Sequence, residues 1–430
     1  MAIRHPQLIE VVLDDRTVGA IAPSVDGAGP TRFQYDSSWL RTGIELAPFL
    51  LPTSAGTRVH EFRGLRPETF HQLAPTFADS LPDRFGNRII DAWLARQGVG
   101  VAEITPLDRL AYVGERAMGA LAYRPPRGPQ VEAPTILDLA ELTVAARAAV
   151  EGRLSADDER TRDALQLVLQ VGTSAGGARP KAVLNVDEET GVFRSGALPP
   201  EPGETAWLLK FDGATDERTL AESRQYTRIE YAYSILARRA GIVMAGCRLL
   251  HEGGRAHFMT RRFDRPAPLE RVHMTTLCGM RALDNDDVGV HDYAQLFETV
   301  IALELGEDAL VECFRRMVFN VAAVNHDDHT KNHAFLMDTA GRWSLAPAYD
   351  LSYANVPGHP WMGQHCLGVD GAFSGIDDAR MLQLAERFGI PYAKRELRRV
   401  REAVDTWPDA AAEAGVPAEQ IAAVSAAHAS

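Results

Sequence analysis

The sequence has few cysteines and no long hydrophobic run. Its four cysteines, at positions 247, 278, 313 and 366, lie far apart and form no CxxC pair. This excludes a disulfide framework and a zinc ribbon, and it favours free thiols in a reducing cytosol. No stretch approaches the ~20 apolar residues of a membrane span, and the first residues lack the apolar core of a signal peptide. We therefore expect a cytoplasmic protein.

An excess of positive charge is also missing, since the formal net charge is −13. A stand-alone nucleic-acid binder would normally carry a basic surface, so the charge disfavours that class of protein. It leaves open contact with DNA through a more basic partner protein. A hydrophobic content of 46% fits a chain with a substantial buried core, and the length has room for two or three domains.

Lysine is the scarcest charged residue, with four copies in 430 residues, at positions 181, 210, 331 and 394. Lysine is a compact point charge and arginine a planar fork, so a tight phosphate contact can require lysine. Three of the four lie in or beside segments that could bind phosphate. The alternative is an arginine-rich genome with a few remaining lysines, and four positions are a small sample.

Local patterns predict two parts. Residues 8–22 alternate between apolar and polar around two Asp residues, which predicts a β-hairpin. Residues 33–40 indicate a strand that runs into a turn, and residues 67–97 indicate helices with a break at 81–83. The segment 124–129 contains three Pro and one Gly, so it cannot lie inside a helix or a central strand. We place the boundary there, giving parts 1–130 and 131–430.

The second part begins with helical periodicity and returns to it later. Helices are expected at 136–150, 157–170 and 219–240. Strands and turns are expected over 171–212 and around 245–251 and 256–264. From about residue 290 the pattern is mainly helical, and the Ala-rich residues 409–430 predict one helix with a frayed end.

The most informative stretch is Asn325 to Asn332, which reads NHDDHTKN. Asp327 and Asn332 have the spacing of the catalytic-loop Asp and Asn of protein kinases, where Asp accepts the hydroxyl proton and Asn binds magnesium. Asp350 lies eighteen residues further on, among apolar residues, and is a candidate second magnesium ligand. The rival functional reading is a metal-dependent phosphohydrolase with ligands in the same stretch, namely His326, Asp327, Asp328, His329 and His333. A polar loop that caps the next helix is the structural alternative.

Three further segments fit phosphoryl transfer, although each has an ordinary explanation. Adjacent glycines in 174–181 would let backbone N–H groups surround a phosphate, but such pairs are common in hairpin turns. Lys210 ends an apolar run and Glu230 follows twenty residues later on a helix, which is the order of a kinase Lys–Glu pair. Either residue could equally be exposed. Residues 259–265 could be an adenine-binding hinge or a charged strand end.

Taken together, these motifs resemble the HipA family of serine/threonine protein kinases, the toxins of bacterial toxin–antitoxin pairs. The resemblance covers nearly the whole chain and rests on residues 33–40, 81–84, 176–181, 262–265, 327–332 and 349–351. It implies an α+β, protein-kinase-like fold, with an N-terminal α/β subdomain packed on a mostly helical C-terminal kinase lobe.

The resemblance also implies a role for individual residues. Asp327 would be the catalytic base, and Asn332 and Asp350 the magnesium ligands. The ATP-binding residues would be Gly176, Gly177, Ala178, Arg179, Pro180, Lys181, Lys210, Arg261, Arg262, Phe263, His329 and Lys331. Ser174, or the adjacent Thr173, would be autophosphorylated, and a phosphate beside the nucleotide loop would repel ATP. Arg179-Pro180 replaces a polar–acidic pair of the family, which leaves the substrate open.

The implied cofactors are ATP and Mg²⁺, and the implied substrate is a protein such as an aminoacyl-tRNA synthetase. The implied partner is a helix-turn-helix antitoxin of the HipB type, through which the chain would reach DNA indirectly. A non-catalytic corepressor that only binds an antitoxin stays open as an alternative.

Overall fold

The computed structural model describes residues 5–25, 27, 29–82, 84–129, 136–150, 180–212 and 226–429. We call residues 5–129 the N-terminal region. Within these ranges its strands form one antiparallel sheet in the order β4-β3-β2-β1-β5. The strands are β1 (Ile9–Leu13), β2 (Arg16–Ala22), β3 (Arg32–Tyr35), β4 (His60–Glu61) and β5 (Ala122–Arg124). The helices are α1 (Ser37–Leu40), α2 (Pro67–Phe70), α3 (Pro75–Ala78), α4 (Arg84–Arg96) and α5 (Pro106–Val113), with short 3₁₀ turns at Thr53–Ala55 and Val101–Glu103.

The hairpin predicted for residues 8–22 is confirmed as β1 and β2. Asp14 and Asp15 connect the strands with positive φ angles of 48° and 57°, which matches the twist that tight hairpins need. The apolar side chains of this sheet and the surrounding helices form one core. That core also includes Cys278 and Met337, from much later in the chain.

A second antiparallel sheet has the strand order β7-β6-β8-β10-β9. Its strands are β6 (Lys181–Asp187), β7 (Phe193–Ser195), β8 (Glu204–Lys210), β9 (Cys247–Glu252) and β10 (Arg255–Arg261). Helix α6 (Leu139–Val150) packs on this sheet through Leu142 and Ala146. Helix α8 (Tyr226–Arg239) contacts β9 and β10.

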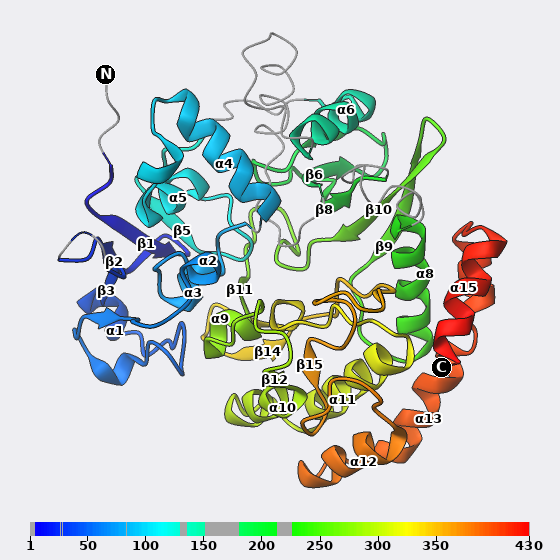
Figure 1. Cartoon of the computed structure of the whole chain (residues 1–430). Coiled ribbons are helices and arrows are strands. Elements are labelled where there is room, and N and C mark those ends of the chain that lie inside the picture. The colour runs from blue at the N-terminus through cyan, green and yellow to red at the C-terminus, as the bar shows by residue number, and fades with distance from the viewer. Residues whose placement is uncertain are drawn as a thin grey trace.

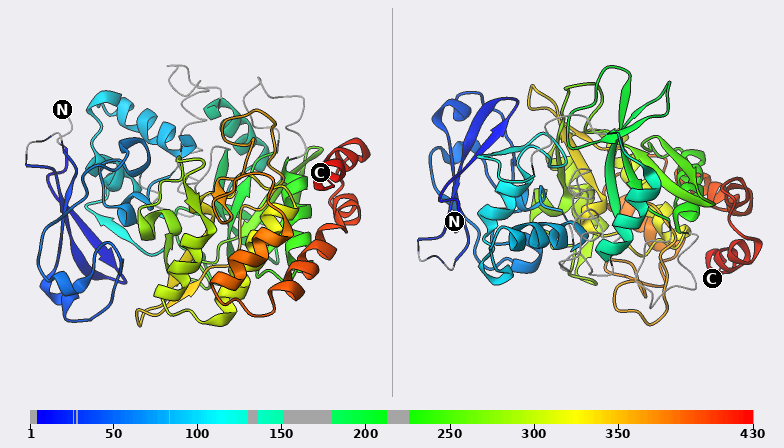
Figure 2. Two further views of the ribbon diagram at one scale, coloured as in Figure 1. Left: turned by 60° about the horizontal axis from the view of Figure 1, so that its bottom comes forward. Right: turned by 90° about the horizontal axis from the view of Figure 1, so that it is seen from above.

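Residues 273–428 form a helical layer with two small sheets. The helices are α9 (Leu277–Arg281), α10 (Tyr293–Ala302), α11 (Glu307–Ala322), α12 (Asp378–Arg387), α13 (Ala393–Val404), α14 (Trp407–Glu413) and α15 (Ala418–His428), with a 3₁₀ turn η6 (Thr330–Asn332). The strands are β11 (His273–Thr276), β12 (His291–Asp292), β13 (Ala334–Met337), β14 (Trp343–Leu345) and β15 (Leu367–Gly368). The N-terminal region and helices α12–α15 lie at opposite ends of the molecule (Figures 1 and 2).

Two expectations for the last third of the chain were incomplete. Strands β13 and β14 interrupt the region expected to be mainly helical, because β13 pairs with β11 from sixty residues earlier. Residues 409–430 do not form one helix. Gly415 has a φ of +71° and Pro417 follows it, and together they end α14 and start α15.

Other expectations lie outside the described residues, namely the helix at 157–170 and the segment 171–179. The domain boundary after residue 130 stays a prediction. None of the helices in the described ranges is long and apolar enough to cross a membrane.

Candidate active site

Lys210 stands at the centre of the candidate site. It is the last residue of β8, and its Nζ donates to Glu230 Oε1 of α8 at 2.5 Å and to Asp350 Oδ1. Burial alone lowers the pKa of the Lys210 ammonium, but the carboxylates of Asp350 and Glu230 outweigh it and hold the pKa above its ordinary value. The cation is therefore fixed between one carboxylate of α8 and one that follows β14.

Lys181 lies directly beside Lys210 in the sheet. It opens β6, its cross-strand neighbour in β8 is Lys210, and its side chain is buried. Burial alone raises the pKa of Asp350, but Lys210 and Lys181 outweigh it and hold the pKa well below its usual range. Pro180 precedes Lys181, and its carbonyl accepts a hydrogen bond from Phe211 N. Two of the four lysines thus meet at one end of the sheet.

The loop between α11 and β13 carries the proposed base. Asn332 Nδ2 donates to the carbonyl oxygen of Asp327 at 2.7 Å and so closes the loop across five residues. The Asp327 side chain is 53% exposed, and its Oδ1 lies 3.9 Å from His329 Nε2. The base candidate is therefore accessible to a hydroxyl group of another protein. His329 also lowers the pKa of Asp350.

Asp328 has the opposite surroundings from its neighbour. It is completely buried, and its carboxylate accepts hydrogen bonds from Tyr293 Oη, from His365 Nδ1 and from the backbone N–H groups of residues 366 and 367. Burial alone raises the Asp328 pKa, but these partners lower it below its ordinary value. Asp328 therefore anchors the loop to Tyr293, His365 and the backbone of residues 366 and 367.

The phosphohydrolase alternative needs at least three of the histidines and aspartates of this loop to face one metal ion, and no three of these described side chains do so. Asp328 is used internally, and His333 is buried with its ring 5.7 Å from that of Tyr293. Burial lowers the pKa of His333 to about 3. The described part of the chain contains no group of three or more His, Cys, Asp or Glu side chains arranged to hold a metal ion.

Magnesium requires a different donor set, which Asn332 and Asp350 fit. Mg²⁺ binds a few amide and carboxylate oxygens and keeps water and phosphate oxygens as its other ligands. The low pKa of Asp350 keeps that carboxylate ionised at neutral pH.

The expected hinge follows β10. Arg261 is exposed, and the Arg262 guanidinium is buried against Asp264 at 2.6 and 3.0 Å. A contact of Arg262 with a nucleotide would therefore have to come from its backbone. The Phe263 ring lies 5.8 Å from the ring of Tyr349. Tyr349 Oη in turn donates to the carbonyl of Lys331 at 2.5 Å.

Of the eleven predicted site residues that lie in the described ranges, the structure brings seven together from distant segments. Those that it brings near one another are Lys181, Lys210, Asp327, His329, Lys331, Asn332 and Asp350. Ser174, Gly176, Gly177, Ala178 and Arg179 lie outside the described residues. Sequence reasoning did not identify Tyr293 and His365, because nothing in their spacing connects them to Asp328.

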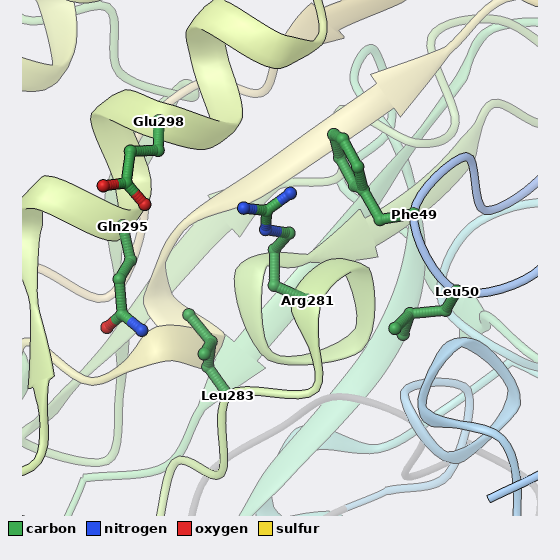
Figure 3. Close-up of a pocket in the computed structure, with 6 residues that line it drawn as sticks. All are labelled: Phe49, Leu50, Arg281, Leu283, Gln295 and Glu298. Carbon is green, nitrogen blue, oxygen red and sulfur yellow. The ribbon is translucent and has the colours of Figure 1, made fainter.

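A cavity of about 340 Å³ lies elsewhere, between the N-terminal region and α9 and α10. Arg281 lies between Phe49 on one side and Gln295 and Glu298 on the other (Figure 3). The Arg281 guanidinium is 4.3 Å from the Phe49 ring centroid. This cavity does not include the proposed catalytic residues.

Two models of known protein domains match this chain. Residues 173–410 match the HipA-like C-terminal domain, and residues 9–124 match the HipA N-terminal domain. Among curated protein sequences, none matches this chain significantly.

Among solved structures, the complex of HipA, HipB and operator DNA from Shewanella oneidensis contains a chain that is 18% identical. The match has a TM-score of 0.66 and covers 98% of this chain and 94% of that one. The proinflammatory kinase CtkA of Helicobacter pylori is 11% identical, with a TM-score of 0.31, and the match covers 49% of this chain and 90% of that one. The first match confirms the predicted α+β fold. The chain belongs to the HipA family of serine/threonine kinases, the toxin components of toxin–antitoxin systems, as the matches to both of its domains show.

Proposed function

We propose that this toxin transfers the γ-phosphate of ATP to a protein hydroxyl group with the help of Mg²⁺. Asp327 is the catalytic base, Asn332 and Asp350 bind the metal, and Lys181, Lys210 and Lys331 contact the phosphates. The observation that carries the proposal is the contact of Lys210 with both Glu230 and Asp350. This contact supports the proposal, because the proposed phosphate-binding cation and the proposed metal ligand belong to one cluster.

The chemistry then follows from the residues. The accessible Asp327 carboxylate accepts the proton of the acceptor hydroxyl as the hydroxyl oxygen attacks the γ-phosphorus. The bond from the γ-phosphorus to the bridging oxygen breaks at the same step, and ADP leaves. Glu230 orients the Lys210 ammonium, which neutralises charge on the phosphates. A bound magnesium ion would add further neutralisation of the phosphate oxygens. Asn332 holds the loop closed through the Asp327 carbonyl.

The substrate and partners extend this proposal. We infer a protein substrate of the translation machinery, such as an aminoacyl-tRNA synthetase, and autophosphorylation of Ser174. We also infer a cytoplasmic location and a HipB-type antitoxin as the partner that contacts DNA. The solved HipA complex, which contains HipB and operator DNA, supports the antitoxin. The net charge of −13 agrees with indirect DNA binding.

Mass spectrometry of the purified protein after incubation with ATP and Mg²⁺ tests the proposal. We expect one added phosphate on Ser174 or Thr173 in the wild type and none in Asp327→Asn. Because Asp327 is half exposed, the variant should fold normally, which circular dichroism checks. Equal phosphorylation of both proteins would reject Asp327 as the base.

If the wild type carries no phosphate and transfers none to a synthetase, this result favours the alternative that the chain is a non-catalytic corepressor. Repression of its own promoter by an Asp327→Asn, Asp350→Asn double variant would then support that alternative.

A further inference from the structure

The turn η6 carries Lys331 and Asn332, and it is held at both ends by one segment. At its start, Thr330 Oγ1 donates to the carbonyl of Leu283 at 2.8 Å. Just after its end, the carbonyl of His333 accepts a hydrogen bond from Leu277 N at 2.7 Å. The supporting segment, residues 276–284, includes helix α9. The position of the turn therefore depends on the position of this segment.

The N-terminal region holds one end of this segment through Thr69. The Thr69 hydroxyl is buried and donates to Asp284 Oδ1 at 2.6 Å. Arg66 Nε lies 3.3 Å from Asp284 Oδ2, so both oxygens of this buried carboxylate face the N-terminal region. Asp284 directly follows Leu283, whose carbonyl holds Thr330. Only one peptide unit separates the two contacts.

Asp79 holds the other end of the segment. Its carboxylate accepts hydrogen bonds from Thr276 N at 2.6 Å and from Thr276 Oγ1 at 2.7 Å. Thr276 is the N-cap of α9 and directly precedes Leu277. Gly279 makes the approach possible, since a Cβ there would come within 2.7 Å of Asp79 Oδ2. The contact therefore needs a glycine on α9 as well as the carboxylate.

We propose that Thr69 and Asp79 are positioning residues that hold Lys331 and Asn332 in place for Mg²⁺ and ATP. The N-terminal region then supports the nucleotide site from outside it, although none of its described residues belongs to the kinase motifs. This inference rests on the proposed function, because it takes Asn332 as a metal ligand. It adds residues that act on that ligand through the 276–284 segment.

Ordinary packing between two regions predicts a different result, and the chain offers a matched control. Thr105 donates to Asp108 at 2.6 Å, which is the same bond length as that between Thr69 and Asp284. This second pair also has a buried carboxylate, but it caps α5 within the N-terminal region and does not contact the 276–284 segment. Loss of either hydroxyl weakens the protein, whereas only loss of Thr69 should change metal binding.

The experiment compares full-length Thr69→Val, Thr69→Ser, Asp79→Asn and Thr105→Val proteins with the wild type. Calorimetry at several Mg²⁺ concentrations measures binding of a non-hydrolysable ATP analogue, and kinetics measures the Mg²⁺ concentration for half-maximal phosphate transfer. All measurements are made at a temperature where circular dichroism shows folded protein. Thr69→Ser keeps the hydroxyl and serves as the rescue variant.

We expect Thr69→Val and Asp79→Asn to raise the half-saturating Mg²⁺ concentration by roughly fivefold to tenfold, as the loss of a charge-assisted hydrogen bond implies. Thr69→Ser and Thr105→Val should stay near the wild type. An unchanged Mg²⁺ requirement in Thr69→Val, or an equal shift in Thr105→Val, would overturn the inference while the proposed function stands. If the wild type binds no Mg²⁺–nucleotide, the proposed function itself fails.

Discussion

Two adjacent carboxylates show how neighbouring residues of one motif take different roles. Asp327 is half exposed, whereas Asp328 is completely buried. The sequence DD alone cannot distinguish them, because the difference arises from Tyr293 and His365, which lie more than thirty residues away on either side. Substitution of Asp328 should therefore lower mainly stability, whereas substitution of Asp327 should lower mainly activity.

We expect Asp328→Asn to lower the free energy of unfolding by about 1–3 kcal/mol, because an amide cannot accept all the hydrogen bonds of the buried carboxylate. Asp327→Asn should change it by no more than about 0.5 kcal/mol, as is usual for surface positions. Urea unfolding of both variants measures the difference. Equal stabilities would contradict the assignment of Asp328 as an internal support.

The Lys210 cluster gives a prediction about pH. In the wild type the folded-state pKa of Asp350 is below its unfolded value. The contribution of Asp350 to the free energy of unfolding is therefore complete above the unfolded pKa, at about pH 4, and it is lost only as pH falls through the folded pKa. The pKa of Lys210 is raised, so the stabilisation by its ammonium group is complete below the unfolded lysine pKa, at about pH 10. This stabilisation is lost as pH rises through the folded pKa. Stability from this cluster should be constant between pH 5 and 8.

We expect Lys210→Met to lose about 3 kcal/mol at pH 7, because it leaves two carboxylates without their shared cation. Burial would then raise the pKa of Asp350, so the variant should become more stable as pH falls from 8 to 5. Thermal unfolding across this range provides the measurement. A variant with the pH profile of the wild type would show that Lys181 alone keeps Asp350 ionised.

At the scale of elements, the segment after β10 joins the second sheet to the N-terminal region. Asp264 is fully buried and forms ion pairs with Arg262 and Arg265. It also accepts a hydrogen bond from Gly119 N at 2.7 Å. Burial alone raises the Asp264 pKa, but the two guanidinium groups hold it well below the usual range. The hinge expected from sequence is thus also a connection between regions.

Asp264→Asn should lower the free energy of unfolding by about 3–5 kcal/mol, since it leaves two buried guanidinium groups short of a carboxylate. Asp338→Asn is the matched control, because Asp338 pairs with Arg342 on an exposed hairpin, where an ion pair contributes at most about 1 kcal/mol. Chemical unfolding compares the two variants. Similar losses would mean that Asp264 is not required for this connection.

Sequence alone predicted the elements that have a strong local signal. The β1–β2 hairpin, helix α8 and the strands β9 and β10 follow from alternation, helical periodicity and turn residues. Strands β13 and β14 are four and three residues long. They are stabilised by sheet pairing, β13 with β11 and β14 with β13, so no local period marks them. The break between α14 and α15 was visible as Gly415 and Pro417 but was outweighed by the Ala-rich composition.

The candidate site was predictable for a similar reason, up to a limit. Asp327, Asn332 and Asp350 lie within one continuous stretch of the sequence, so their spacing forms a motif that can be recognised without the structure. Thr69 and Asp79 contact the 276–284 segment from 215 and 197 residues earlier in the chain, through one and two hydrogen bonds respectively. Such contacts depend on tertiary packing, which one sequence does not display.

At the scale of the whole molecule, the N-terminal region and the kinase core share a hydrophobic cluster. Cys278 and Met337 pack among the side chains of the N-terminal core. Chains of this length often unfold in several steps. Here the shared core and the contacts at Thr69, Asp79 and Gly119 should couple the two regions.

We therefore expect one urea transition, with coincident curves from circular dichroism and tryptophan fluorescence. Gly119→Ala should lower its midpoint, because Gly119 has a φ of +76° and a Cβ there would lie 2.9 Å from Met274 N. Two separated transitions in the wild type would contradict the coupling.

The scarcity of lysine makes the protein unusually simple to probe with amine-reactive reagents. Lys394 is exposed on α13, Lys331 is half-buried, and Lys181 and Lys210 are buried side by side. Four peptides then report all side-chain amines, and three of them come from the proposed site. The rate at which each is labelled, with and without nucleotide, would be a residue-level record of how far ATP closes that site.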